Sequence, residues 1–138
     1  MTVGLKVGGI VDEVGAPDFL HAFFSTISRH LEPQGWGSRF PELMEELYQG
    51  RLDAAKATKA ITDLRQIQKE LKAFGPNQVI WDFENPARKP PWEDNISRDI
   101  TDLSNYFVTS TGKDLFEVLF ECLSVLQRRG GSLTIEHY

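Results

Sequence analysis

The segment from Gly112 to Arg129 constrains the fold most strongly, because its apolar residues occupy most of the circumference of a helix. Its polar side chains form only a narrow stripe, made of Glu117, Glu121, Ser124 and Arg128. A helix that is apolar on nearly every side has to be covered by other elements. We therefore predict that this helix is the most buried element. Thr111 and Asp114 have the spacing of a capping box at its start.

Three further helices are predicted from apolar residues that recur three and four positions apart. The first covers residues 17–31 and begins at Pro17, which fits the first turn of a helix. The second is short, with Ser38 as its cap and Gly50 at its end. The third covers residues 53–74 and ends before a glycine and a proline.

Three segments alternate apolar and polar residues, as half-buried strands do: residues 2–11, 78–83 and 132–138. The pair Gly8-Gly9 indicates a bulge or a close backbone contact in the first of them. Residues 106–109 are predicted as a further short strand. Strands at both ends and in the middle, with helices between them, predict an α+β fold. We expect a small, mostly antiparallel sheet with about four helices packed on it. Whether the first and last strands are neighbours stays open.

Length and charge limit the possible functions. The 138 residues fit one domain with its own core. Fifteen basic and 20 acidic side chains give a net charge of −5, which argues against nucleic-acid binding and suits a basic protein partner. The single cysteine excludes an internal disulfide. No signal peptide or membrane-spanning stretch is recognised, so we expect a cytoplasmic protein with no membrane contact.

Metal and nucleotide sites are not expected. The stretch from Asp94 superficially resembles a calcium loop, but its sixth residue is Asp99 rather than glycine and its twelfth is Tyr106 rather than glutamate. Short polar side chains in that stretch are better interpreted as turn formers and caps. The glycines after the first strand do not follow the order of a phosphate-binding loop. We therefore predict no metal and no cofactor.

Catalytic chemistry has one candidate, a small hydrolase that uses His21 with Asp18 or with a loop carboxylate. His21 is surrounded by apolar residues of its predicted helix, which favours a structural histidine. Cys122 lies in the middle of the apolar helix, where an inert buried thiol is the expected state. The residues by themselves therefore name no catalyst, and we expect a binding protein.

Two acidic groups are candidates for partner contact. Glu42, Glu45 and Glu46 cluster on the second predicted helix, where a solvated surface is the plainer interpretation. Trp92, Glu93 and Asp94 lie in a proline-rich loop. Loop tryptophans, Trp36 and Trp92 among them, either pack on the core or form energetic centres of interfaces, and packing is favoured here. Trp81 is expected in the core.

Four stretches occur in an order that resembles the immunity protein 70 family: "GAPDFLHAFFSTISRHLE", "GWGSRFPELMEELYQGRL", "VIWDFENPARKPPWEDNIS" and "ITDLSNYFVTSTGKDLFEVL". The resemblance runs from Gly15 to about Leu126. It implies a single immunity-type domain over residues 1–138 that binds the C-terminal domain of a cognate polymorphic, contact-dependent-inhibition type toxin. Neutralisation of that toxin requires no catalysis by the inhibitor. A basic nuclease suits the negative charge, although other toxin activities are equally open.

The resemblance also divides the acidic loop into scaffold and contact residues. We expect the scaffold to anchor its apolar side chains on the core and to cap turns with its polar ones; the anchors are Ile96, Ile100, Leu103 and Phe107, and the caps Asn95, Ser97, Asp99 and Asp102. Trp92, Glu93 and Asp94, with the three glutamates, are the predicted toxin contacts, since a preorganised loop loses less entropy on binding. A non-catalytic adaptor or self-associating protein is the other alternative, and the oligomeric state stays unknown.

Overall fold

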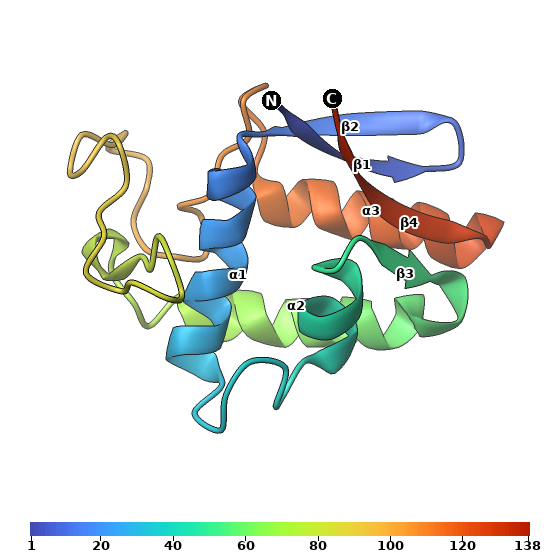
Figure 1. Cartoon of the computed structure of the whole chain (residues 1–138), viewed down its shortest axis with the longest axis horizontal. Coiled ribbons are helices and arrows are strands. Elements are labelled where there is room, and N and C mark those ends of the chain that lie inside the picture. Colours follow the sequence, from blue (N-terminus) through green and yellow to red (C-terminus); the bar gives the residue numbers. More distant parts are fainter.

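In the computed structural model, which describes residues 1–138, one antiparallel sheet of four strands has the spatial order β2-β1-β4-β3. The strands are β1 (Val3–Val7), β2 (Ile10–Gly15), β3 (Arg51–Asp53) and β4 (Ser132–His137). The helices are α1 (Pro17–Leu31), α2 (Ala57–Leu71), α3 (Leu115–Arg129) and the π-helix η1 (Glu42–Leu47). The α+β fold with about four helices is therefore confirmed (Figure 1).

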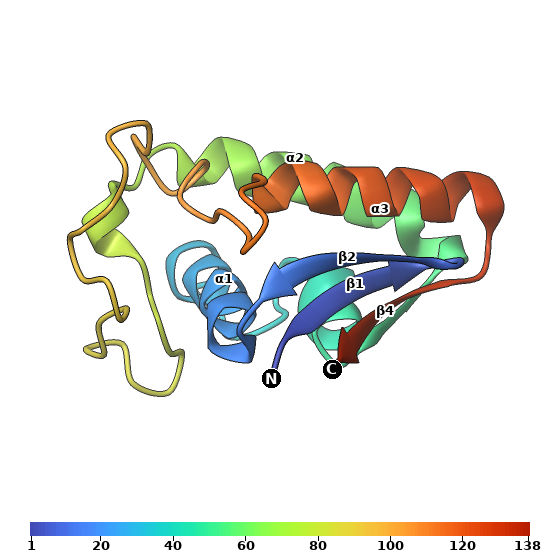
Figure 2. The same ribbon diagram turned by 90° about the horizontal axis from the view of Figure 1, so that it is seen from above.

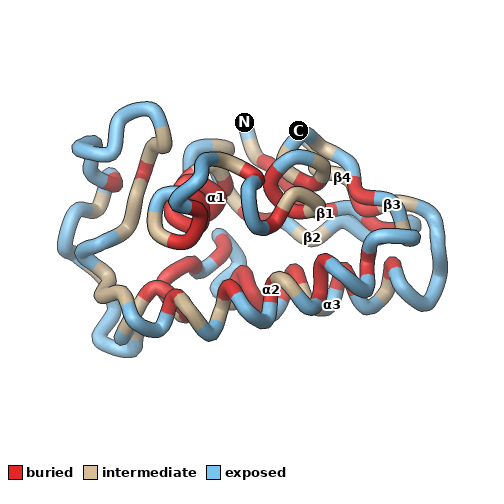
Figure 3. Tube along the Cα trace, turned by 90° about the horizontal axis from the view of Figure 1, so that it is seen from below, coloured by how far each residue is buried: buried red, intermediate tan, exposed pale blue.

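The sheet buries one face and exposes the other. Val3, Leu5 and Val7 of β1 are buried while Lys6 is exposed, and Leu133 of β4 is buried opposite Val7. The helices α2 and α3 run side by side along the sheet, and the chain termini lie together at one end (Figure 2). Buried positions therefore concentrate between the sheet and the helices (Figure 3).

The predicted single strand over residues 2–11 is wrong, because the chain reverses at Gly8-Gly9 and continues as β2. Val7 pairs with Ile10 across a turn of two residues, and Gly8 has a φ of 61°. A two-residue hairpin needs a positive φ at its first central residue, which glycine adopts without strain. The open question about the terminal strands is also answered, since β1 pairs with β4.

Helix α3 shows the predicted apolar and polar pattern, but the prediction that it is the most buried element is wrong. The buried side chains of α3 cover most of its circumference, and the four predicted stripe residues are exposed. Helix α1, of equal length, has ten buried residues against seven in α3, because the core covers one side of α1 and residues 78–83 cover the other.

The predicted capping box at the start of α3 is wrong. Asp114 itself is the N-cap and accepts a hydrogen bond from the Phe116 N–H at 3.1 Å, while the Thr111 hydroxyl contacts Thr109. A capping box would need Asp114 in the first turn of the helix, three residues after the N-cap. The helix begins only at Leu115, so Asp114 occupies the N-cap position itself.

Other predicted elements differ in their bounds. The second helix has Pro41 rather than Ser38 at its cap position, and the helix over residues 53–74 begins as strand β3 and a short 3-10 turn, η2 (Ala54–Lys56). A further 3-10 turn is η3 (Pro76–Gln78). Residues 106–109 form only an isolated bridge, from Val108 to Asp114.

The predicted strand over residues 78–83 is also wrong, because this segment, which we call the strap, lies along α1 instead of entering the sheet. Thr26 bonds both main-chain groups of Ile80, accepting from its N–H at 3.0 Å and donating to its carbonyl at 3.2 Å. Ser25 accepts from the N–H of Phe83 at 3.0 Å. Side chains of a helix therefore supply the partners that a neighbouring strand would otherwise supply.

Both ends of the strap are held in the same way. The Nε2 of His30 lies 2.6 Å from the carbonyl of Gln78, and the guanidinium of Arg29 donates to the carbonyl of Phe83. Arg29 also lies 4.2 Å from the centre of the Phe83 ring. Within the strap Trp81 is buried, as predicted.

A buried carboxylate shapes the loop that follows α1. Glu32 is only 3% exposed and accepts hydrogen bonds from the N–H groups of Gly37, Arg39 and Phe40 at 3.0 to 3.1 Å. Charged acceptors make stronger hydrogen bonds than neutral ones. This carboxylate fixes the course of the loop that carries Trp36.

The loop before α3 behaves largely as the predicted scaffold. Leu103 and Phe107 are fully buried, and Ile96 and Ile100 pack against the core. Ser97 and Asp102 cap turns as predicted, whereas Asn95 and Asp99 make no side-chain hydrogen bond. Asn105, which the sequence did not single out, accepts from the N–H groups of residues 101 and 102.

Truncation of Leu119 tests the placement of the core. Leu119 is 1% exposed on α3, so Leu119→Ala should lower the free energy of unfolding by about 2–5 kcal/mol. Urea denaturation followed by circular dichroism measures this change. Ser124→Ala, on the exposed stripe of the same helix, is the control and should change stability by less than about 0.5 kcal/mol. Equal effects of the two substitutions would contradict the burial described here.

Replacement of Thr26 by valine tests how the strap is held. Thr26→Val keeps the shape but removes both hydrogen bonds to Ile80, so stability should fall by about 1–3 kcal/mol. The Ile80 amide should also exchange its hydrogen faster. Thr62→Val, on the exposed face of α2, removes a single bond to the Thr58 carbonyl and should have little effect. Unchanged exchange at Ile80 would show that other contacts hold the strap.

Candidate functional site

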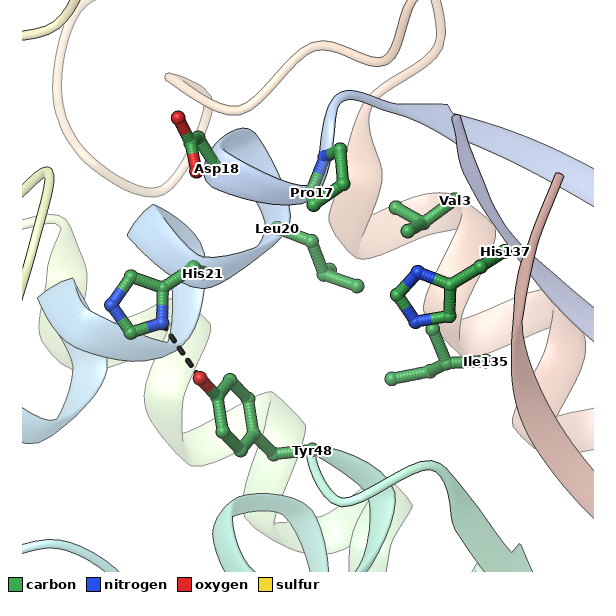
Figure 4. A pocket seen from close by; sticks show the side chains of 8 residues that line it. All are labelled: Val3, Pro17, Asp18, Leu20, His21, Tyr48, Ile135 and His137. Carbon is green, nitrogen blue, oxygen red and sulfur yellow. Dashed lines mark hydrogen bonds between the residues drawn. The ribbon is translucent and has the colours of Figure 1, made fainter. Parts of the chain in front are cut away.

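Two surface hollows share a wall made by His21 and Tyr48. The first, which we call the sheet hollow, has a volume of about 280 Å³ and lies between the start of α1 and the ends of β1 and β4 (Figure 4). Its other lining residues are Val3, Pro17, Asp18, Leu20, Ile135 and His137. The second, the aromatic hollow, also has about 280 Å³ and is lined by His21, Trp36, Tyr48, Gln49, Phe83 and Glu84.

His21 joins three segments of the chain through its ring nitrogens. Nδ1 lies 2.7 Å from the Tyr48 hydroxyl, and Nε2 lies 3.2 Å from the carboxylate of Asp82. A neutral ring with its proton on Nε2 satisfies both contacts, since Tyr48 then donates to Nδ1 and Nε2 donates to Asp82. The Glu84 N–H and, next, His21 hold the pKa of Asp82 below its ordinary value. Burial raises the pKa of Tyr48, which keeps its proton on the phenol at neutral pH.

The predicted pairing of His21 with Asp18 is wrong. The Asp18 carboxylate lies 3.6 Å from Arg88, and Figure 4 shows it turned away from the His21 ring. The carboxylate that His21 contacts is Asp82, in the strap that was predicted as a strand. The cluster therefore ties α1, η1 and the strap together.

Metal-binding side chains do not gather anywhere in the fold: no group of three or more histidine, cysteine, aspartate or glutamate residues has the geometry to hold an ion. Asp94 and Asp99, the residues considered for a calcium loop, both have exposed side chains in separate turns. Of the residues from 94 to 99 that were interpreted as turn formers and caps, only Ser97 bonds a main-chain N–H, that of Asp99, with its side chain.

Trp92 packs on the core, as the sequence favoured. Its indole Nε1 donates to the hydroxyl of Tyr106 at 2.8 Å. Its ring meets Trp81 edge-on at 5.1 Å between centroids and lies 6.5 Å from Phe19. Burial raises the pKa of Tyr106. The tryptophan therefore fixes the base of the loop, and the two residues after it project from a rigid support.

Glu93 and Asp94 lie at the meeting point of three shallow hollows. Both residues line two of these, of about 220 and 200 Å³, and a third of about 180 Å³ shares Ile96 and Tyr106 with its neighbour. The third is mostly apolar, and Trp92 is part of its wall. Glu93 has a φ of 48°, an unusual conformation for a residue other than glycine. Neither carboxylate forms an ion pair, so both charges face solvent.

The glutamates of η1 differ from one another. Glu42 lies 3.2 Å from Lys59, and Glu46 lies 2.7 Å from Lys56, so both carboxylates bind lysines at the start of α2. Glu45 is exposed and has no ion pair. Helix η1 packs against β3, on the opposite side of α1 from the loop of residues 85–105 (Figure 1), so the six predicted contact residues form two patches.

Sequence reasoning missed the aromatic hollow. The sequence indicates Trp36 only as a loop tryptophan, Tyr48 only as a neighbour of the acidic cluster on the second predicted helix, and Phe83 only as an apolar residue of a predicted strand. The three rings come from a loop, the end of η1 and the strap, and no local pattern connects them. The one available signal was that all three residues are large aromatic side chains.

Fold and site together define a class: a small α+β protein whose one-sided sheet is covered by helices, and whose surface offers preformed hollows and exposed carboxylates. No helix has the length and apolar character to cross a membrane. Within this class the chain belongs to the immunity protein 70 family, whose model matches residues 5–135. The resemblance noted in the sequence is therefore confirmed. No curated protein and no solved structure gives a significant match.

Cys122 should be unreactive in the folded protein. Burial, with the nearby Asp12 carboxylate, raises the pKa of its thiol to about 12. Because the thiolate is the reactive form, iodoacetamide at pH 8 should modify the native protein far more slowly than the protein in urea. Since the folded pKa lies above the unfolded one, this group's contribution to stability is present below about pH 9 and is lost as the pH rises toward 12. Rapid native alkylation, measured by mass spectrometry, would contradict this burial.

Proposed function

We propose that the protein binds and neutralises the toxin domain of a polymorphic, contact-dependent-inhibition type toxin in the cytoplasm of the producing cell, without catalysis. Membership of the immunity protein 70 family is the observation that carries this proposal. An immunity protein acts by occupying its target, so it needs a stable, complementary surface and no reactive group of its own. A specific complex would bury about 1,600 Å² in total.

The net charge of −5 supports a basic partner. Complementary charge speeds the encounter of two proteins and disfavours wrong partners. A nuclease whose active site is basic to receive phosphates is the toxin type that fits best. In that case carboxylates of the immunity protein would occupy the positions that phosphates take in the substrate.

We place the centre of the contact surface at Trp92, Glu93 and Asp94. Trp92 is locked by Tyr106, so the turn loses little conformational freedom on binding. Glu93 and Asp94 have no ion pair to break, and the adjoining hollows offer space for partner side chains. Glu45 is proposed as a contact in the second patch. Glu42 and Glu46 remain in the proposed set, although their lysine partners reduce the charge that they present.

Binding and inhibition test the function directly. The toxin domain encoded by the neighbouring upstream gene should form a complex with the purified protein and lose its activity at equal stoichiometry. Analytical size exclusion and an activity assay of the toxin domain measure both. If the protein neither binds that domain nor inhibits it, the proposed function fails.

Charge reversal tests the contact surface separately. Glu93→Lys combined with Asp94→Lys should weaken toxin binding by at least about tenfold at low salt, with little change in melting temperature, because both side chains are exposed. Glu117→Lys combined with Glu121→Lys, on the exposed stripe of α3, makes the same change in net charge and is the matched control. Equal affinities of the two double variants, measured by isothermal titration calorimetry, would move the interface elsewhere.

A further inference from the structure

We propose that the aromatic hollow receives one positively charged side chain, a lysine or an arginine, from the toxin domain. This inference rests on the proposed function and adds a second, specific anchor at a distance from the Trp92 turn. It assigns a ligand chemistry to Trp36, Tyr48 and Phe83. None of these three is among the six predicted contact residues.

The three rings pack edge-to-face on one another and together form an aromatic wall of the hollow, which we call the cage. Trp36 meets Phe83 at 5.0 Å between centroids with an interplanar angle of 89°, and it meets Tyr48 at 4.9 Å and 64°. The ring of His21 stacks on Trp36 at 6.4 Å. The ring surfaces that remain free of these contacts line an open volume of about 280 Å³. Aromatic faces attract ammonium and guanidinium groups electrostatically, which is how such cages bind cations.

The charged groups around the hollow are acidic, which favours binding of a cation. Glu84 is the one acidic residue in the lining, it is exposed, and it has no ion pair. Asp82 lies behind His21, and the Glu84 N–H helps to keep it ionised by lowering its pKa. No lysine or arginine of this chain lines the hollow. An anion would meet Glu84 and the electron-rich ring faces, so it is disfavoured there.

Phe83 already binds one cation of the chain itself. The guanidinium of Arg29 lies 4.2 Å from the Phe83 ring centre, although Arg29 does not line the hollow. This contact occupies one face of the Phe83 ring, so the proposed occupant would lie against the part of the ring that lines the hollow. Trp36, the best of the aromatic side chains for such contacts, has no cation of this chain near its ring.

The cage is held in shape before any partner arrives. The Trp36 Nε1 donates to the carbonyl of Met44 at 2.8 Å, and the Tyr48 hydroxyl is bonded to His21. The main chain of Phe83 is fixed by Ser25 and Arg29. Rings that are already ordered lose little entropy on binding, so a single cationic side chain gains most of the available interaction.

A titration of the isolated full-length protein tests the cage without any toxin. The probes are N-acetyl-arginine amide and N-acetyl-lysine amide, with the uncharged N-acetyl-citrulline amide as control. In NMR spectra the two charged probes should shift resonances of Trp36 and Tyr48 and leave those of Trp81 unchanged, while the citrulline compound should shift none of them. Glu84→Gln should weaken the shifts. The absence of shifts, or equal shifts from citrulline, would overturn the proposal.

Toxin binding then tests the occupant. Glu84→Gln should weaken binding of the toxin domain by about two- to fivefold and Trp36→Leu by about tenfold, with Glu121→Gln as the exposed control that should change nothing. Glu84 is exposed, so its variant should keep the wild-type melting temperature. If the wild type binds the toxin and both cage variants bind equally well, the cage is not a contact. If the wild type binds no toxin, the proposed function fails, and so does the proposal that a toxin side chain occupies the hollow. The probe titration then tests by itself whether the hollow binds cations.

Discussion

The structure depends on polar side chains of α1 that satisfy the main chain of the strap. Thr26 and Ser25 bond two of its N–H groups, and Arg29 and His30 bond the carbonyls at its two ends. Buried main-chain groups without partners are costly, so these contacts decide where residues 78–83 can lie. The strap in turn delivers Asp82 to His21 and Phe83 to Trp36, and it leads the chain into the acidic loop.

The same helix is buried on its other side, so α1 has almost no free surface. Its phenylalanines pack edge-on with one another and with residues of α3 and of the preceding loop; these contacts join Phe23 to Phe24, Phe107 and Phe116. The sheet leaves one face to solvent, and the apolar helix α3 covers the other. The central helix is therefore covered by the core on one side and by the irregular strap on the other.

Rigid loops suit an inhibitor, because affinity is lost whenever binding has to order flexible groups. Both proposed contact regions follow this rule. Trp92 is bonded to Tyr106 beneath the exposed carboxylates, and Trp36 is bonded to Met44 beside the aromatic hollow. The two regions carry unpaired carboxylates next to aromatic surface. This combination favours a partner that presents basic side chains, and the net negative charge acts in the same direction at longer range.

The sequence by itself determined the features that depend on local periodicity: the bounds of α1, the apolar and polar pattern of α3, the strand at residues 132–137 and the core position of Trp81. It also determined the charge and, through its motifs, the family. Only the tertiary structure decided that residues 78–83 form a strap and not a strand. An alternating pattern does not specify whether a neighbouring strand or the side chains of a helix will hydrogen-bond the main chain. It likewise decided that His21 meets Asp82 and that Trp36, Tyr48 and Phe83 enclose a hollow. Those contacts join residues far apart in the chain, and no spacing within a segment records which distant side chains will meet.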